Sequence, residues 1–327
     1  MANLKTKYMG LELRNPLVVA SSSLTGKVDK CKKCEDAGAG AVVLKSIFEE
    51  QIVSESDKQY ESSSAVYHPE ALDYINRTVS YHSRDQYLEL IRGAKDTLSI
   101  PVIASINCVS LENWVDYAKD IENAGSDGLE LNLFITPKDP KTEGSIIEKI
   151  YFHVIKEIKK RVNLPVALKI SPFFTNLFHI TDQFEAKGIS ALVLFNRFYH
   201  FLIDTDKLEL KQGEILTSKE EMALTLRWIS LLSERYEYDL AATTGIHDAD
   251  GVIQQLLAGA TVVQMASALF KDGVAKLGEI IKDLEGWMKK HDFDSIADFR
   301  GKLSQEKAKN PTAYERFQYI KSFVGVD

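Results

Sequence analysis

The sequence is poor in cysteine. Its three cysteines, Cys31, Cys34 and Cys108, are too few to form a disulfide framework in a chain of 327 residues. Cys31 and Cys34 form a Cys-x-x-Cys pair, but no second pair of ligands stands at the spacing of a zinc site. The residues around the pair are charged and helical in pattern. We therefore interpret the pair as two thiols on neighbouring turns of a helix, and we expect no metal site.

Long apolar runs and blocks of positive charge are also absent. No run approaches the length that crosses a bilayer, and the first residues lack the apolar core of a signal peptide. Acidic residues outnumber Lys and Arg by 47 to 40, for a net charge of −7, and no Lys/Arg cluster alternates with aromatic residues. We therefore expect a cytoplasmic protein that binds neither a membrane nor nucleic acid.

Eight short apolar runs alternate with longer amphipathic stretches. Each run is hydrophobic at nearly every position, which is typical of a strand that is covered on both faces in a parallel sheet. Glycines at Gly38, Gly125, Gly188 and Gly259 supply the left-handed residue that ends a helix before the next strand. The predicted strands are Pro16–Ser21, Ala41–Ser46, Val102–Asn107, Gly128–Phe134, Val166–Ser171, Ala191–Asn196, Leu240–Ile246 and Val262–Leu269.

Repeated strand–helix units form either a closed barrel or a doubly wound open sheet. Eight units favour closure, and no Gly-x-Gly-x-x-Gly follows the first strand, as a dinucleotide-binding open sheet would need. The sequence therefore predicts an α/β protein, a single-domain (β/α)₈ TIM barrel. We expect a hairpin over residues 1–14, the barrel over 15–290 and a C-terminal helical extension over 291–327, with one amphipathic helix at Asp294–Gln305.

Two long loops interrupt the regular spacing, after the second and sixth strands. Residues 47–83 hold a polar stretch, and residues 197–216 have the pattern of a short hairpin. Both loops follow the carboxyl ends of barrel strands, where long insertions usually line or cover an active site.

Polar side chains end several of the apolar strands. Lys45 and Lys169 end the second and fifth strands, and Asn132 and Asn196 end the fourth and sixth. In a barrel these ends meet at one rim, where the chemical sites of this fold lie. Lysine is almost never fully buried without a partner, so two lysines in the mouth of a barrel predict an anionic ligand.

The last two strands deliver small residues to the same rim. Thr244-Gly245 and Ala266-Ser267 place backbone N–H groups where barrels of this class bind phosphate. The helix after Gly245 begins at an Asp cap, and its free N–H groups and dipole also favour an anion. A phosphate at one end and two lysines at the other describe FMN, so the pattern predicts this cofactor.

The sequence resembles the class 1 dihydroorotate dehydrogenases over nearly its whole length. The matching pieces, in order, are YMGLELRNPLVVASS, AVVLKS, ELNL, LPVALKISP, FNR and TTGIHDADGVIQQLLAGATVVQMASAL. The resemblance implies an FMN-dependent oxidoreductase that transfers a hydride between a small, pyrimidine-like substrate and FMN, and by analogy a homodimer.

The resemblance also assigns roles to residues at the rim. Lys169 would face the N1–O2 edge of the flavin, where negative charge develops on reduction, and is the expected tuner of the redox potential. The family usually has glycine at positions 244 and 266, so the phosphate loop is bulkier here. The implied contacts are Ala20, Ser21, Lys45, Ser46, Asn132, Lys169 and Asn196 for the flavin, Thr244, Gly245, Ala266 and Ser267 for its phosphate, and Lys45, Asn132 and Asn196 for the substrate.

The catalytic loop departs from the family. The family has Asn-x-Ser-Cys-Pro-Asn after the fourth strand, and its Cys removes a proton as hydride leaves the substrate. Without a gap, Ile135 takes the Cys position here, and isoleucine has no acid–base chemistry. A one-residue insertion would instead set Thr136-Pro137 against Cys-Pro, which makes Thr136 a candidate base beside the catalytic candidates Lys45 and Lys169. The family's substrate-clamping asparagine loop is also missing.

Several alternatives stay open at this point. One is a flavin-binding or electron-relay protein without dehydrogenase activity of its own. Another is a Schiff-base aldolase that uses Lys169 or Lys45, and a third, a dihydrouridine-synthase-like enzyme acting on tRNA, is disfavoured by the negative charge. Further candidate bases are Tyr67, His68, Cys108, Tyr199 and His200.

Overall fold

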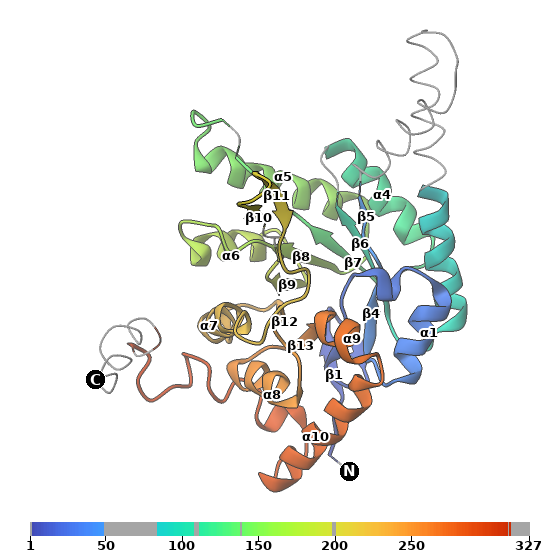
Figure 1. The fold of residues 1–327 in the computed structure, drawn as a ribbon, viewed down its shortest axis with the longest axis vertical. Helices are drawn as coiled ribbons and strands as arrows, with labels where there is room; N and C mark the ends of the chain where they lie inside the picture. Colours follow the sequence, from blue (N-terminus) through green and yellow to red (C-terminus); the bar gives the residue numbers. More distant parts are fainter. Residues whose placement is uncertain are drawn as a thin grey trace.

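The computed structural model describes residues 2–48, 84–107, 111–137, 139–197, 201–312 and 314. Eight parallel strands form a closed barrel, since β4 pairs with β3 on one side and with β6 on the other. This arrangement, visible in Figure 1, confirms the predicted TIM barrel. The barrel strands are β3 (Leu17–Val19), β4 (Ala41–Val43), β6 (Val102–Asn107), β7 (Gly128–Asn132), β8 (Val166–Ile170), β9 (Ala191–Leu194), β12 (Asp239–Thr243) and β13 (Val262–Met265).

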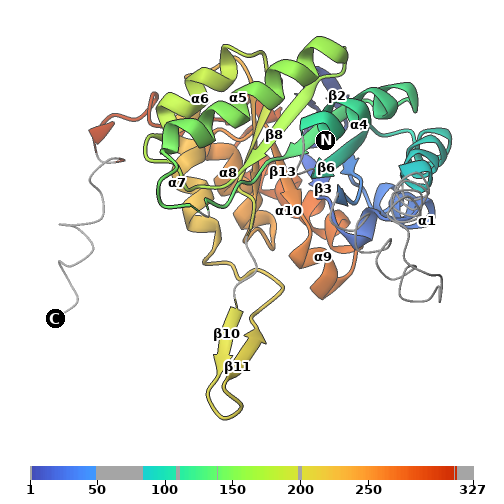
Figure 2. The ribbon, with the colours of Figure 1, turned by 90° about the horizontal axis from the view of Figure 1, so that it is seen from above.

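Each predicted strand overlaps one of these eight, but the last was predicted too long. Residues Ser267–Asp272 form helix α9, so the strand ends at Met265. The helices surround the barrel (Figures 1 and 2), and residues 84–97 are helical as well. Their bounds are α1 (Val28–Asp36), α4 (Leu111–Asn123), α5 (Gly144–Arg161), α6 (Leu177–Glu185), α7 (Met222–Leu232), α8 (Ala249–Ala258) and α10 (Lys276–Lys290), with short 3₁₀ turns η1 (Ser23–Thr25) and η2 (Ile296–Asp298).

The strands bury side chains on both faces, as their continuous apolar pattern predicts. One large cluster packs between the strands and the helices, and a second, smaller cluster fills the barrel interior. The interior cluster includes Val18, Ile103 and Val193, and is joined by Tyr8 from a hairpin formed by β1 (Thr6–Tyr8) and β2 (Leu11–Leu13). Tyr8 is fully buried, so this hairpin closes the amino-terminal end of the barrel and leaves only the opposite end for a ligand.

The four glycines expected to end helices all have positive φ angles. At Gly259, after α8, φ is 119°, and a Cβ built there would lie 1.9 Å from Ser233 Oγ. Glycine is therefore required both by the backbone conformation and by the close approach of the neighbouring loop.

The loop after the sixth barrel strand contains the predicted hairpin. Strands β10 (Phe201–Asp204) and β11 (Glu209–Gln212) pair antiparallel with each other. Figure 2 shows the hairpin standing away from the barrel. Of the other long loop, the structure describes only the short strand β5 (Ile47–Phe48), which pairs in parallel with the end of β6. Residues 49–83 lie outside the described residues.

The predicted helix at Asp294–Gln305 is wrong. Only η2 is helical there, and Gly301 has a φ of 72°, which no continuing α-helix accommodates. The N–H groups of Gly301 and Leu303 donate instead to the carbonyls of Leu256 and Leu257 in the last turn of α8. Because these end carbonyls need partners, the segment satisfies a neighbouring helix rather than forming its own.

Cys31 and Cys34 lie on one face of α1 and are buried free thiols. Burial raises the pKa of Cys31 to about 12 and that of Cys34 to about 11, so both thiols stay protonated near neutral pH. In the described part of the chain no cluster of three or more His, Cys, Asp or Glu side chains is placed to hold a metal. No described helix is long and apolar enough to span a membrane.

Candidate functional site

A cavity of about 830 Å³ lies where the carboxyl ends of the barrel strands meet. This volume is within the usual range of roughly 300–1,000 Å³ for small-molecule sites. All eleven residues predicted to contact the flavin or its phosphate line this one cavity. They are Ala20, Ser21, Lys45, Ser46, Asn132, Lys169, Asn196, Thr244, Gly245, Ala266 and Ser267.

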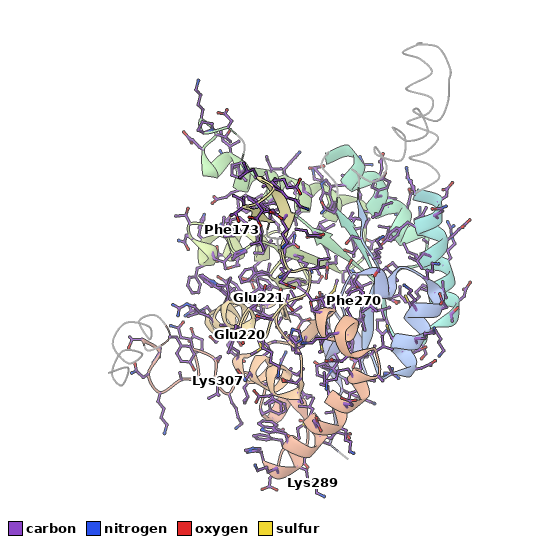
Figure 3. The ribbon with its side chains drawn as sticks, in the orientation of Figure 1. Phe173, Glu220, Glu221, Phe270, Lys289 and Lys307 are labelled. Atoms are coloured by element: carbon purple, nitrogen blue, oxygen red, sulfur yellow. The ribbon has the colours of Figure 1, made fainter. Side chains whose placement is uncertain are left out.

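The cavity carries an excess of positive charge. Lys45 and Lys169 form no ion pair with any described residue, whereas Arg197 is paired with Glu221 (labelled in Figure 3). No Asp, Glu, His or Cys is among the described residues that line the cavity. Two unpaired lysines in a chain with a net charge of −7 leave this cavity in need of an anion.

Two asparagines connect the lysine side of the cavity. Asn132 ends β7 and stands in register with Lys169 on β8. Asn196, just after β9, donates a hydrogen bond from its Nδ2 to Asn132 Oδ1, at 2.7 Å. This contact orients both amides and leaves Asn132 Nδ2 and Asn196 Oδ1 for a ligand.

Three serines near the carboxyl ends of β3, β4 and β6 form a hydroxyl chain. Ser46 Oγ lies 2.9 Å from Ser21 Oγ and 2.7 Å from Ser105 Oγ, and the Ser46 N–H donates to Ser21 Oγ. The hydroxyl of Tyr87 accepts from the Ser105 N–H and donates to the Ser105 carbonyl. Burial raises the pKa of Tyr87, so its hydroxyl stays protonated. The chain fixes the orientation of the two serines that were expected to touch the flavin.

A buried polar pair lies at the floor of the cavity. Gln264 Nε2 donates to Glu130 Oε2 at 2.7 Å, and both side chains are 1% exposed. Gln264 also lines the cavity. Both residues lie in pieces that match the family, ELNL and GATVVQMASAL, but sequence reasoning assigned them no role because each stands inside an apolar strand.

The two last strands form the other end of the cavity. Gly245 has a φ of 75°, and a Cβ built there would lie 2.3 Å from Met222 N, so only glycine fits. Thr244 has a φ of 79°, a conformation that a β-branched residue rarely adopts. The Gly245 N–H donates to Thr217 Oγ1 at 3.3 Å, and the Thr217 N–H donates to Ser267 Oγ at 3.0 Å.

The first turn of α8 has a side-chain cap. Asp248 caps it, as the sequence predicted, by accepting from the Gly251 N–H, and pairs with Lys219. Burial alone would raise the pKa of Asp248, but the hydrogen bonds from Lys219 and Gly251 outweigh it and lower the pKa. Asp248 takes one N–H of this turn and no residue of α8 is among the described lining residues, so the expectation that this helix start would help to bind phosphate stays a prediction. A phosphate there depends on the groups around Gly245, Ala266 and Ser267.

The structure does not bring every predicted residue to the cavity. Thr136 is exposed and is not among the lining residues, whereas Phe134 lines the wall. The other candidate bases, Tyr67, His68, Cys108, Tyr199 and His200, lie outside the described residues.

Three lining residues come from a loop that has no recognisable motif. Ile215, Leu216 and Thr217, which precede α7, form part of the wall. Phe270 of α9, labelled in Figure 3, also lines the cavity. The sequence predicted that the long loop over residues 197–216 would line or cover the site, and Ile215 and Leu216 confirm this. The hydrogen bonds that hold Thr217 there run to residues distant in the chain and were not predictable.

Comparison with known proteins gives consistent matches. Residues 3–288 match the family model described as dihydroorotate dehydrogenase. The chain is 27% identical over 315 residues to dihydroorotate dehydrogenase B (NAD(+)), catalytic subunit, of Thermoplasma acidophilum, covering 92% of this chain and 99% of that protein. The protein of that name from Methanocaldococcus jannaschii is 27% identical over 302 residues, with coverage of 89% and 95%. Dihydroorotate dehydrogenase A (fumarate) of Lactobacillus delbrueckii is 24% identical over 312 residues, with coverage of 93% and 99%.

The backbone at Thr244 generates a prediction about stability. A left-handed conformation costs a residue other than glycine about 1–2 kcal/mol. We expect Thr244→Gly to be more stable than Thr244→Ala by about 1 kcal/mol, because both lose the hydroxyl and only glycine avoids the penalty. Urea denaturation of the two variants measures the difference. Ala266, with a φ of −140°, is the matched control, and Ala266→Gly should be destabilised. An alanine at 244 as stable as glycine would contradict this account of the loop.

Proposed function

The chain belongs to the dihydroorotate dehydrogenase family, and we propose that it is an FMN-dependent oxidoreductase acting on a small anionic substrate. The observation that carries the proposal is the cavity, where eleven residues implied by the family pattern surround a space with two unpaired lysines and no described acid. When bound, FMN would supply the hydride acceptor that the side chains lack.

The residues present fit this cofactor. The small residues of the last two strands, Thr244, Gly245, Ala266 and Ser267, line one end of the cavity together, and they leave backbone and hydroxyl groups rather than bulky side chains there. The backbone donors near Ala266 and Ser267 do not depend on whether position 266 is glycine or alanine. We propose that Thr244, Gly245, Ala266 and Ser267 hold the phosphate, and that Ala20, Ser21, Lys45, Ser46 and Lys169 contact the ring, together with Asn132 and Asn196.

Lys45 and Lys169 would neutralise negative charge in the cavity. The two lysines carry no described counter-ion, and an anionic ligand would offset the cost of holding Lys169, which is partly buried, while Lys45 is exposed. Asn132 and Asn196, already bonded to each other, would orient a planar polar substrate through their remaining donor and acceptor. Lys45 would approach the same substrate.

The weak point of the proposed reaction is proton removal. The described lining includes Phe134 but neither Ile135, which takes the position of the family's Cys, nor Thr136, which is exposed. Loss of a general base lowers a rate by about 10²–10⁴-fold. We therefore propose altered substrate use rather than efficient turnover of dihydroorotate.

The electron acceptor, the oligomeric state and the location stay open. The relatives' names differ in acceptor, NAD(+) for the archaeal proteins and fumarate for the bacterial one, so family membership alone defines none. The homodimer and the cytoplasmic location remain predictions.

Replacement of Lys169 should lower the reduction potential of bound FMN. Unit charges about 4 Å apart at an effective dielectric constant of about 20 attract by about 4 kcal/mol. At about 1.4 kcal/mol per 30 mV for two electrons, this bounds the fall in Lys169→Ala at about 90 mV. Spectroelectrochemical titration of the FMN-loaded variant measures it. Lys187, just after α6, lies over the ring of Phe152 of α5, and Lys187→Ala is the control that should leave the potential unchanged. An unchanged potential in Lys169→Ala would place this lysine away from the flavin.

Anaerobic mixing with dihydroorotate should leave the bound flavin oxidised for many seconds. Without the base, the rate of flavin reduction falls by about 10²–10⁴-fold, and the missing asparagine loop weakens substrate binding as well. Stopped-flow absorbance at the flavin band follows the reaction, and dithionite provides the control that the flavin can be reduced. Bleaching within about a second would mean that another residue acts as the base. Thr136→Val and His68→Ala would then identify it.

A further inference from the structure

Residues 214–218, between β11 and α7, form a strap across one wall of the cavity. Ile215, Leu216 and Thr217 line the cavity from this segment. Within the described part of the chain, the hydrogen bonds that hold residues 214–218 run to side chains of other segments, to the carboxylate of Glu221 just before α7 and to the Gly245 N–H, not to a neighbouring strand. The position of the strap therefore depends on a few side chains.

Arg197 holds one end of the strap. Its Nη1 donates to the carbonyls of Glu214, at 3.1 Å, and Ile215, at 2.8 Å, and its Nη2 donates to that of Leu216, at 3.5 Å. The Nε and Nη2 also bind the carboxylate of Glu221, at 2.8 and 3.3 Å. The guanidinium therefore donates its hydrogen bonds to the strap and pairs its charge with Glu221, so it is poorly placed to bind a ligand itself.

Thr217 holds the other end. Its N–H donates to Ser267 Oγ, its Oγ1 accepts from the Gly245 N–H, and its Oγ1 lies 3.2 Å from Nε2 of the buried His247. Gly245 and Ser267 are the groups assigned above to the phosphate. The backbone of the strap therefore joins the hydrogen bonds of Arg197, beside Asn196, to those of Thr217 at the phosphate end of the cavity.

We propose that Thr217 is a phosphate-binding residue and that Arg197 and Glu221 are positioning residues that hold it in place through the strap. This inference rests on the proposed function, since the phosphate is that of FMN. Thr217 Oγ1 accepts from the Gly245 N–H and Ser267 Oγ accepts from the Thr217 N–H, so each hydroxyl keeps its own proton to donate to a phosphate at this end of the cavity. Affinity for the phosphate then depends on Arg197, a residue at the ring end of the cavity.

The ratio of the dissociation constants for riboflavin and FMN tests the proposal, because only FMN carries the phosphate. Arg197→Lys keeps the charge but loses the planar set of donors, and Thr217→Val keeps the shape but loses the hydroxyl. A hydrogen bond to a charged group corresponds to about tenfold in affinity or somewhat more. Each variant should lower the preference for FMN by about tenfold, and the double variant should lower it no further than the larger single effect. Arg161→Lys, exposed at the end of α5, is the control and should retain the preference.

Two outcomes overturn the proposal. An unchanged preference in either single variant would remove Thr217 or Arg197 from the phosphate end, and multiplying effects in the double variant would show that the two act separately. If the unaltered chain binds neither flavin, the proposed function fails. Hydrogen exchange at the Gly245 amide in the ligand-free chain then tests the positioning role of Arg197 independently of flavin binding. Exchange should rise in Thr217→Val and by a similar factor in Arg197→Lys, and an unchanged rate in Arg197→Lys would refute the positioning role.

Discussion

Closure of the barrel is the constraint on which the site depends. The pairing of β4 with β6 completes a ring of strands that all run in the same direction, so their carboxyl ends meet around one space. Residues as far apart in the chain as Ser21 and Ser267 become walls of one cavity for this reason. The hairpin of β1 and β2 blocks the other end with Tyr8, which leaves the rim as the side from which a ligand enters.

Electrostatics then divides the cations at this rim into two groups. Arg197 is satisfied by Glu221 and by the carbonyls of the strap, so it acts within the protein. Lys45 and Lys169 have no such partner among the described residues, so their charge is directed at whatever occupies the cavity. At the phosphate end, Asp248 likewise acts within the protein by accepting from the first turn of α8, whereas the groups around Gly245 line the cavity.

The sequence was sufficient for features whose cause is local. The runs that became β6 and β7 are apolar at nearly every position because both faces are buried, and that pattern is visible without any structure. The positions of the rim residues could be predicted from the fold, because residues at the carboxyl ends of barrel strands meet at one rim. The amphipathic pattern of Asp294–Gln305 misled, because Gly301 and the unsatisfied carbonyls of α8 decide the conformation there. The place of residues 197–216 at the cavity followed from their position after the sixth strand, but the hydrogen bonds of Thr217 to residues distant in the chain were not predictable.

The flavin content of the purified protein tests the central claim most directly. Protein expressed with riboflavin available should show the flavin absorption bands and release about one FMN per chain on denaturation, since the phosphate end and the two lysines would retain it during purification. If the protein is colourless, titration of the folded protein with FMN should restore the bands at the same stoichiometry. Neither bound flavin nor binding on titration would contradict the account, and trapping of a carbonyl substrate by borohydride on Lys169 or Lys45 would then favour the aldolase alternative.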